Sequence, residues 1–209
     1  MPAPPAPSDR PSAPPGQPSQ PGGAAPADPP RPSARLLLAR HAPILGAGLA
    51  GRRDVDADCS DRGALDWLAA HLRGAGALWT SPARRCLQTC AAMGLAGAQS
   101  RAELWEQDFG QWEGPGPLPD LGPLGPEALA AHRPPGGESF LDMAARVHPL
   151  FEAATGTVAV LAHAGTVRAA LALAVGPAAL SFSVAPLSLT ILSRHPGGWA
   201  VEAVNRIAP

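Results

Sequence analysis

Two histidines in the sequence each follow a short apolar run. Residues 34–39 ("ARLLLA") lead directly into Arg40 and His41, and residues 157–162 ("TVAVLA") lead into His163. Runs of this length are typical of buried strands. In open α/β sheets, ligands bind outside the carboxyl ends of the strands. We therefore expect Arg40, His41 and His163 to meet in one crevice if the two strands are neighbours.

A third apolar run adds another cationic group to this crevice. Residues 77–80 ("ALWT") are followed by Ser81, and Arg85 comes one helical turn later. Guanidinium groups bind phosphate oxygens through paired N–H donors, helix N-termini attract anions, and histidine can accept a phosphoryl group covalently. Two histidines, two arginines and two helix N-termini therefore predict a site for a compact anion, above all phosphate.

Phosphoryl transfer also needs a proton donor for the leaving oxygen. The segment "LWEQDFGQWEG" offers three carboxyl groups, Glu106, Asp108 and Glu113, among aromatic residues. A carboxyl group beside an apolar wall stays protonated more readily than one in water and can act as a general acid. The residue types alone leave all three as candidates.

The elements that must position these residues alternate between strand and helix. Apolar spacing and capping residues predict helices over residues 61–74, 81–94, 137–156 and 165–176, the second with Ser81 as N-cap and Pro82 as its first residue. Residues 187–193 and 199–204 are interpreted as two final strands that form an antiparallel edge. This alternation predicts an α/β fold, a three-layer sandwich with a mostly parallel sheet and helices on both faces.

The composition bears on the class of protein. The chain of 209 residues has a net charge of −1, which gives no electrostatic case for binding nucleic acid or a membrane. All 16 basic residues are arginine, so every cationic site must be an arginine site. The three cysteines, Cys59, Cys86 and Cys90, are too few for a disulfide framework and lack a second pair for a metal. We expect reduced thiols in a cytoplasmic protein without metal or cofactor.

The first 34 residues differ in composition from the rest. They hold 13 of the 27 prolines and no apolar run, so they cannot bury enough surface to offset the entropy of ordering. We expect residues 1–34 to be a disordered tail and residues 35–209 to be the folded domain. The tail lacks the features of a signal peptide, and no later run is expected to reach the length of a membrane span. The alternative is that this Pro-rich arm recruits a partner.

Several separated segments resemble motifs of one family, the histidine phosphatase superfamily, also called phosphoglycerate mutase-like. Their joint order and spacing are specific, and the resemblance spans nearly all of residues 35–209. Within the superfamily, the chain is most similar to the α-ribazole phosphatase branch of the cobalamin pathway. The segments are "ARHAP" (39–43), "GRRDVDADCSDRG" (51–63), "SPARRCLQT" (81–89), "LWEQDFGQWEG" (104–114), "PPGGESF" (134–140) and "LAHAGTVRAAL" (161–171).

The resemblance implies a role for each candidate residue. The nucleophile that forms a phosphohistidine is His41, the proton donor is Glu106, and the phosphate clamp consists of Arg40, Arg85 and His163. Water would then hydrolyse the phosphohistidine while Glu106 switches from acid to base. No metal is expected, because the clamp itself neutralises the transferring group.

The chain departs from the family pattern after its first histidine. The usual R-H-G-[ED]-[TS] reads R-H-A-P-I, so Ala42 replaces glycine and Pro43 has no N–H to donate. The backbone N–H of Ala42 is expected to remain available to the phosphate. Arg52 or Arg53 is a candidate to replace a lost phosphate contact.

The other polar residues carry structural expectations. Glu113 is interpreted as a supporting residue of the site. Arg168, in the helix after His163, is expected to brace the fold rather than to touch substrate. The Gly- and Pro-rich residues 114–133 predict a short or mobile cap over the site. Four histidines that fit no ligand spacing are expected on the surface or in helix packing: His71, His132, His148 and His195.

The resemblance favours hydrolysis of a small phosphorylated substrate, α-ribazole 5′-phosphate, because "PGGES" and the compact length match that branch. Two alternatives of the same class are a phosphatase of other small phosphomonoesters and a phosphoglycerate mutase-like enzyme. An alternative of another class is a catalytically weak module that binds a phosphorylated ligand while the Pro-rich arm recruits a partner. The sequence leaves the oligomeric state open.

Overall fold

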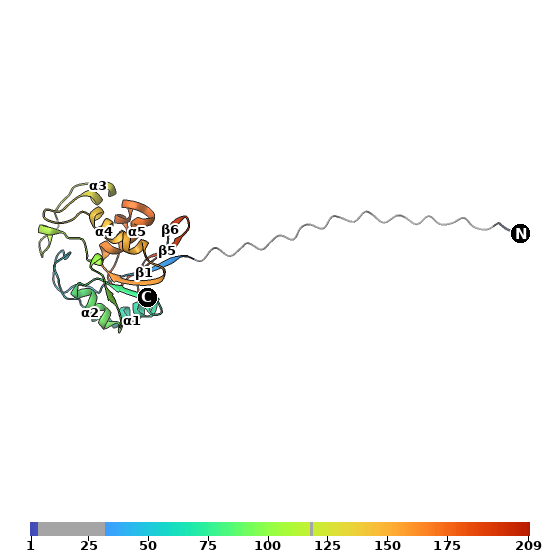
Figure 1. Ribbon diagram of the computed structural model, residues 1–209, viewed down its shortest axis with the longest axis horizontal. Coiled ribbons are helices and arrows are strands. Elements are labelled where there is room, and N and C mark those ends of the chain that lie inside the picture. Colours follow the sequence, from blue (N-terminus) through green and yellow to red (C-terminus); the bar gives the residue numbers. More distant parts are fainter. Residues whose placement is uncertain (4–31, 118) are drawn as a thin grey trace. The chain divides into compact units, whose positions relative to one another are not determined.

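The computed structural model describes residues 1–3, 32–117 and 119–209 (Figure 1). Most of the predicted tail, residues 4–31, lies outside the described residues, so its disorder stays a prediction. Residues 31–209 form a compact unit of their own. The first strand of that unit begins at Ala34.

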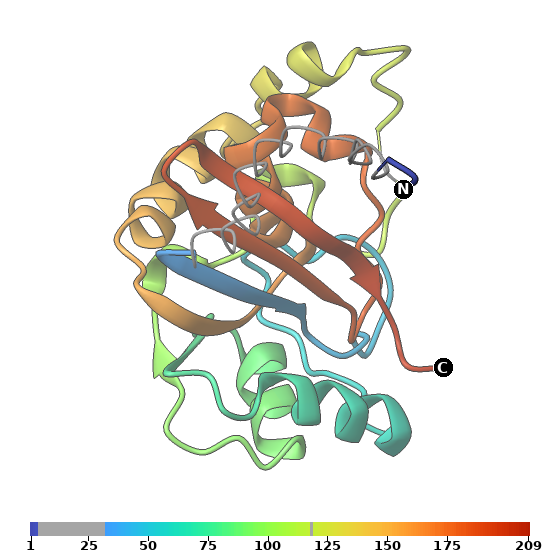
Figure 2. The ribbon, with the colours of Figure 1, turned by 90° about the vertical axis from the view of Figure 1, so that its right-hand side faces the viewer.

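Six strands form one sheet in the part of the chain that the structure describes (Figure 2). Their order is β3-β2-β4-β1-β5-β6; β3, β2, β4 and β1 pair in parallel, whereas β5 and β6 are antiparallel. The predicted, mostly parallel sheet with an antiparallel edge is confirmed. The strands are β1 Ala34–Arg40, β2 Ala77–Thr80, β3 Gln99–Ser100, β4 Gly156–Ala162, β5 Leu189–His195 and β6 Gly198–Arg206.

Helices cover both faces of this sheet, which confirms the predicted three-layer sandwich. The alternation of side chains along β1 explains the layers. Leu37 and Ala39 pack with α1 and α2 on one face, while Leu36 and Leu38 pack with α4 and α5 on the other. The ribbons show these two pairs of helices on opposite sides of the sheet (Figure 1, Figure 2). Each buried leucine contributes about 1.5–3 kcal/mol relative to an exposed one. The helices are α1 Arg62–Leu72, α2 Arg84–Ala92, α3 Pro126–Ala131, α4 Phe140–Glu152 and α5 Ala164–Val175.

The parallel pairing of β1 with β4 positions the two histidines. Arg40 pairs with Ala162 at the carboxyl ends of these strands. His41 and His163 therefore follow at neighbouring strand ends, and the backbone N–H of His41 donates to the carbonyl of Ala162 at 3.0 Å. On the other side of β4, Ser81 follows the end of β2. The crevice expected from the sequence is thus formed by three adjacent strands.

The helix termini follow their local chemistry, with one difference from expectation. Asp61 caps α1 by accepting a backbone N–H of the first turn at 2.9 Å, and Ser139 forms a capping box with Asp142 at α4. The expectation that Ser81 is the N-cap of α2 is wrong. This helix begins at Arg84, and the Ser81 hydroxyl serves the site described below.

The stretch expected to be a short or mobile cap contains a helix that the sequence analysis missed. This helix, α3, begins with Pro126, and proline fits the first position of a helix. It contacts α4 and the 3-10 helix η3 (Gly176–Ser181). The segments before and after the cap pack closely at Gly110. A Cβ atom at this position would lie 2.2 Å from the carbonyl oxygen of Pro135. Its φ of 51° also favours glycine.

One helical run is longer and more apolar than the sequence analysis expected. Ala164–Ser181, which combines α5 with η3, has the length and mean hydropathy (1.3) of a membrane span. The expectation that no run reaches this length is therefore wrong. The finding is weak evidence for a membrane, because core helices pass the same test. Here Val167, Ala170 and Leu171 are buried in the core that α5 shares with α4.

Candidate active site

A cavity of about 520 Å³ opens at the carboxyl ends of β1 and β4. Arg40 and His41 line it from the end of β1, and Arg168 lines it from α5. Glu106 lines it from an irregular segment between the 3-10 helices η1 (Ala102–Leu104) and η2 (Gly110–Trp112). The structure thus brings three predicted site residues, and one residue expected to be a brace, to the same cavity.

The ring of His41 borders this cavity although only 4% of the residue is exposed. Nδ1 lies 2.6 Å from the carbonyl oxygen of Ala42. Because a carbonyl only accepts, Nδ1 carries the proton and the lone pair of the neutral ring is on Nε2. Burial lowers the pKa of His41 to about 3; the hydrogen bond to Ala42 opposes this shift, and the charges of Arg85 and Arg40 add to it. His41 is therefore neutral at pH 7, with Nε2 free to act as a nucleophile.

His163 lies against His41, but its nitrogens point at protein groups. The two ring centroids are 5.2 Å apart in an edge-to-face arrangement. Nδ1 accepts from Nε of Arg85 at 3.3 Å, so Nε2 carries the proton and donates to the Ser81 hydroxyl at 2.8 Å. Complete burial, aided by the nearby positive groups, lowers the pKa of His163 well below its usual value. His163 is thus a neutral, hydrogen-bonded ring packed against His41.

Arg85 is fully buried, and its guanidinium holds the loop that follows β1. It donates to the carbonyls of Ala50 and Arg53 at 3.1 Å and of Gly51 at 2.8 Å, besides His163. Four of its five N–H donors are therefore bound within the protein. Burial lowers the pKa of Arg85. Arg85 and His163 lie together as predicted, but their direct contact with phosphate stays a prediction, because their donors are directed elsewhere in this structure.

The Glu106 side chain lies at the N-terminus of α5. Oε2 accepts the backbone N–H of Gly165 at 3.2 Å, and Oε1 accepts that of Gln107 at 3.0 Å. A Cβ atom at Gly165 would lie 2.1 Å from Oε1. Glycine at this position therefore makes room for the carboxyl group beside the cavity.

The other two carboxyl candidates are bound away from the cavity. Asp108 accepts the backbone N–H of Gly110 at 2.9 Å. Glu113 accepts the backbone N–H groups of Arg52 at 2.7 Å and Arg53 at 2.5 Å. Glu113 thus shapes the loop after β1, and Glu106 is the one of the three candidates that lines the cavity.

Arg40 and Arg168 both line the cavity, and each guanidinium group is fixed by one carbonyl. Arg40 donates to the carbonyl of Val184 at 2.7 Å, and Arg168 donates to that of Phe182 at 3.0 Å. Burial lowers the pKa of both groups, while the charge of Glu106 acts in the opposite direction. The expectation that Arg168 only braces the fold is therefore incomplete. The signal missed was its helical position, four residues after the first residue of α5.

The expectation that the backbone N–H of Ala42 remains available to phosphate is wrong, and Arg53 is bound within its own loop, whereas a phosphate contact of Arg52 stays a prediction. The backbone N–H of Ala42 donates to the hydroxyl of Thr89 at 3.1 Å and does not face the cavity. The Arg53 side chain donates to carbonyls of its own loop. The guanidinium of Arg52 lies over the ring of Trp105, 5.5 Å from its centroid.

The outer part of the cavity is apolar. Trp112 stacks on His132 there, with centroids 5.2 Å apart and planes 16° apart. His132 therefore belongs to the cavity wall, in contrast to the surface or packing role expected for it. Apolar side chains from the loop after β1, the segment of Glu106, the cap, α4 and η3 complete the wall: Ile44, Leu49, Phe109, Leu121, Leu129, Phe140 and Leu180.

Cys86 is the thiol nearest to the paired histidines. Its sulfur lies 3.7 Å from Nε2 of His163. Burial raises the pKa of this thiol, so it is neutral and is not a competing nucleophile. Across the described ranges, no group of three His, Cys, Asp or Glu side chains is placed to hold a metal ion.

Comparison with known proteins agrees with this geometry. A mycobacterial glucosyl-3-phosphoglycerate phosphatase is 25% identical, with a TM-score of 0.65 over 82% of this chain and 98% of that one. A protein solved as mycobacterial hydrolase 1 is 26% identical (TM-score 0.66; 83% and 99% covered), and a protein from Thermus thermophilus is 27% identical (TM-score 0.63; 82% and 98% covered). No curated protein matches the chain. The family model described as histidine phosphatase superfamily (branch 1) matches residues 36–207. The chain therefore belongs to the histidine phosphatase superfamily.

Proposed function

We propose that this phosphatase acts through a phosphohistidine on His41, and that its substrate is α-ribazole 5′-phosphate of cobalamin biosynthesis. The observation that carries the mechanism is the neutral His41 ring. Its proton is on Nδ1, bound to the carbonyl of Ala42, and Nε2 is left for attack. Membership of the histidine phosphatase superfamily supports the same assignment.

The reaction has two steps in this proposal. First, Nε2 of His41 attacks phosphorus, the N–P bond forms, the ester P–O bond breaks, and Glu106 gives its proton to the leaving alcohol oxygen. Water then attacks the phosphohistidine and Glu106 takes a proton from that water. Inorganic phosphate leaves, and His41 returns to its neutral form.

The arginines divide into two groups by their position. Arg40 and Arg168 would bind the phosphate oxygens directly, because both residues line the cavity. Arg85 and His163 lie beside His41 and are proposed to complete the phosphate clamp, although their donors are bound to protein groups in this structure. For Arg85 to bind phosphate through both terminal nitrogens, it would have to give up hydrogen bonds to the loop after β1.

The cavity wall supports an apolar leaving group. The ring stack of Trp112 on His132 and the apolar side chains around it offer a surface for a flat ring. α-Ribazole 5′-phosphate carries a benzimidazole ring and no charge beyond its phosphate. Among the described lining residues, Arg40 and Arg168 are the only arginines, so a carboxylate at the outer end would find no third guanidinium.

The mycobacterial relative favours a second candidate substrate. That protein is described as a glucosyl-3-phosphoglycerate phosphatase, and this chain covers 98% of its length. A phosphorylated glycerate derivative is therefore the alternative, and its carboxylate would then have to bind at the same end as Arg40 and Arg168.

A panel of substrates distinguishes these candidates. Phosphate release would be measured from α-ribazole 5′-phosphate, p-nitrophenyl phosphate, glucosyl-3-phosphoglycerate and 3-phosphoglycerate, and formation of 2-phosphoglycerate would report a mutase. We expect the highest kcat/KM for α-ribazole 5′-phosphate and no activity in His41→Ala. A higher kcat/KM for either glycerate ester would reject the α-ribazole assignment and leave the phosphatase mechanism intact.

The binding-module alternative makes a different prediction. It requires tight binding of a phosphate analogue with no turnover of any ester. Vanadate is a suitable probe, because the mycobacterial relative was also solved with VO3. Binding of vanadate together with turnover of at least one ester would favour the enzyme.

A further inference from the structure

The segment that carries Glu106 lacks regular secondary structure. Residues 105–109 lie between η1 and η2 and belong to no helix or strand. A general acid must nevertheless meet the leaving oxygen at hydrogen-bond distance, and a misplacement of about 1 Å can cost a hundredfold in rate. Something outside the segment must therefore hold it.

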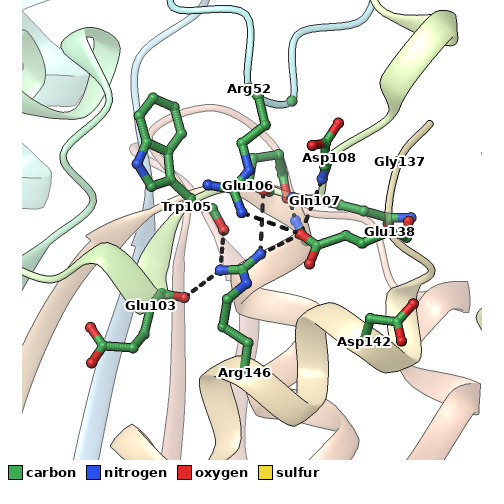
Figure 3. A network of polar contacts seen from close by, with 12 residues as sticks. Arg52, Glu103, Trp105, Glu106, Gln107, Asp108, Gly137, Glu138, Asp142 and Arg146 are labelled. Carbon is green, nitrogen blue, oxygen red and sulfur yellow. Dashed lines mark hydrogen bonds and ion pairs between the residues drawn. The ribbon is translucent and has the colours of Figure 1, made fainter.

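Arg146 holds the segment from α4. One terminal nitrogen donates to the carbonyls of Glu103 at 2.6 Å and Trp105 at 3.0 Å (Figure 3). The other terminal nitrogen lies 3.5 Å from the carbonyl of Glu106 and 2.5 Å from a carboxylate oxygen of Glu138. Arg146 thus contacts three backbone oxygens at or just before the residue that carries the carboxyl group.

Glu138 holds the other end of the segment. Its carboxylate accepts the backbone N–H of Asp108 at 3.1 Å, and its own N–H donates to the carbonyl of Asp108 at 2.9 Å. Its carbonyl accepts the side-chain amide of Gln107 at 2.8 Å. Arg52, from the loop after β1, lies 3.7 Å from the same carboxylate (Figure 3). The pair Arg146–Glu138 therefore links α4, the Glu106 segment and the loop after β1.

We propose that Arg146 and Glu138 are positioning residues for the general acid Glu106. Neither side chain lines the cavity, so neither touches the substrate. Both side chains are largely covered, with 22% and 17% exposed, so the pair is shielded from solvent more than a surface ion pair is. The inference rests on the proposed function, in which Glu106 protonates the leaving oxygen.

The leaving group provides a readout that a merely structural role would not move. An alkyl alcohol is a poor leaving group and needs the proton from Glu106, whereas p-nitrophenolate leaves readily without it. Loss of positioning should therefore slow phosphoryl transfer from an alkyl phosphate and spare transfer from p-nitrophenyl phosphate. General damage to the site should slow both.

The experiment measures single-turnover release of the alcohol from a simple alkyl phosphate and from p-nitrophenyl phosphate. The variants are Arg146→Gln, Glu138→Gln and the general-acid reference Glu106→Gln. Arg194→Gln is the matched control. Its guanidinium donates to carbonyls at the other end of α4, those of Glu152 and Ala154, and its side chain is also 22% exposed.

We expect Arg146→Gln to slow release from the alkyl ester about 10- to 100-fold and release from p-nitrophenyl phosphate less than about threefold. Glu106→Gln should show the same selectivity with a larger loss. Arg194→Gln should match wild type with both esters. Glu138→Gln keeps the Arg146–carbonyl contacts and should show a smaller selective loss, which maintains the test if Arg146→Gln does not fold.

Equal slowing of both esters in the two positioning variants, or no slowing in either, would overturn the positioning role. The phosphatase assignment would survive that result, because the wild type and Arg194→Gln would still turn over. Absence of any turnover in the wild type would instead overturn the proposed function and the inference with it.

Discussion

The nucleophilic form of His41 results from burial. Its ring sits between the carbonyl of Ala42 and the ring of His163, with two guanidinium groups near enough to oppose a positive charge. A protonated His41 could not attack phosphorus, so the same surroundings that make the residue reactive also make the folded chain sensitive to acid.

We predict that the free energy of unfolding falls as the pH falls below neutral. In the unfolded chain His41 binds a proton near its usual pKa of 6.5, whereas in the folded chain its pKa is about 3. The unfolded state therefore binds more protons between these values, and the stability is complete above about pH 6.5 and lost towards pH 3. From pH 7 to pH 5 the loss from this residue is about 2 kcal/mol. Urea unfolding of wild type and His41→Asn across this range measures it.

If the free energy of unfolding of the wild type did not change between pH 7 and pH 5, His41 would not be a buried, neutral ring. The variant should keep only the part of the slope that comes from His163, whose pKa is lowered in the same direction.

Arg168 provides a second prediction at the scale of single residues. Charge-assisted hydrogen bonds are worth about 1.5–3 kcal/mol, so Arg168→Gln should lower kcat/KM about 10- to 100-fold if the guanidinium binds phosphate. Arg62→Gln is the control, because Arg62 also donates to one carbonyl, that of Ala92, but lies on α1. Steady-state kinetics should show a lower kcat/KM, and inhibition assays a lower affinity for vanadate, in Arg168→Gln but not in Arg62→Gln. If Arg168→Gln bound vanadate as tightly as the wild type, Arg168 would not bind phosphate and would only brace the fold.

The identities of the main site residues could be predicted from the sequence, but their hydrogen-bond partners could not. His41 and His163 stand at the ends of apolar runs, a pattern visible in one dimension. Arg85 also stands at the predicted place, yet its donors are taken by carbonyls of residues 50–53. These hydrogen bonds depend on the conformation of the irregular loop after β1, which no local sequence pattern predicts.

At the scale of elements, the N-terminus of α5 has room for the Glu106 carboxyl group because Gly165 has no side chain. Gly165 is the second residue of that helix, and a Cβ there would meet Oε1 of Glu106 at 2.1 Å and the end of Met143 at 3.0 Å. The nearest atoms belong to flexible side chains, so a substitution should move Glu106 rather than unfold the helix.

We therefore predict that Gly165→Ala lowers kcat for an alkyl phosphate at least about tenfold, while the melting temperature changes little. The matched control is Gly63→Ala, at the second position of α1, where the nearest atom to an added Cβ is 3.7 Å away. The control should keep full activity. A fully active Gly165→Ala would contradict the placement of the Glu106 carboxyl group.

The regular elements were predictable because their signals are local. Apolar runs indicated β1, β2 and β4, and spacing and caps indicated α1, α4 and α5. Two elements could not be predicted: α3 lies in a Gly- and Pro-rich stretch, and β3 has only two residues, too few to show a period. The helix α2 begins later than predicted, because the Ser81 hydroxyl bonds to His163 instead of serving as the N-cap.

At the scale of the whole molecule, the site draws on segments far apart in the chain. Arg40 ends β1 and His41 follows it, Glu106 lies near the middle of the chain, and Arg168 lies on α5, which contacts β1. All of them lie within residues 31–209, which form a compact unit of their own. In the described part of the chain, every strand of the sheet and every residue that lines the cavity lies at or after Ala34.

Deletion of residues 1–30 should therefore leave kcat/KM and the melting temperature unchanged. The shortened chain keeps Ser33, whose backbone N–H donates to the carbonyl of Arg194 at 2.8 Å and closes the start of β1. A large loss of activity on deletion would show that the Pro-rich segment takes part in the reaction. Loss of a bound partner with full activity would support the recruiting role.

The central claim is that the phosphoryl group passes through His41. The most direct test mixes the enzyme with excess substrate, quenches with alkali within the first turnover, and locates the modification by peptide mass spectrometry. A phosphoryl group on the peptide that contains His41, absent in His41→Ala, is the predicted result. Turnover with no phosphopeptide, or a phosphoryl group on His163 instead, would contradict it.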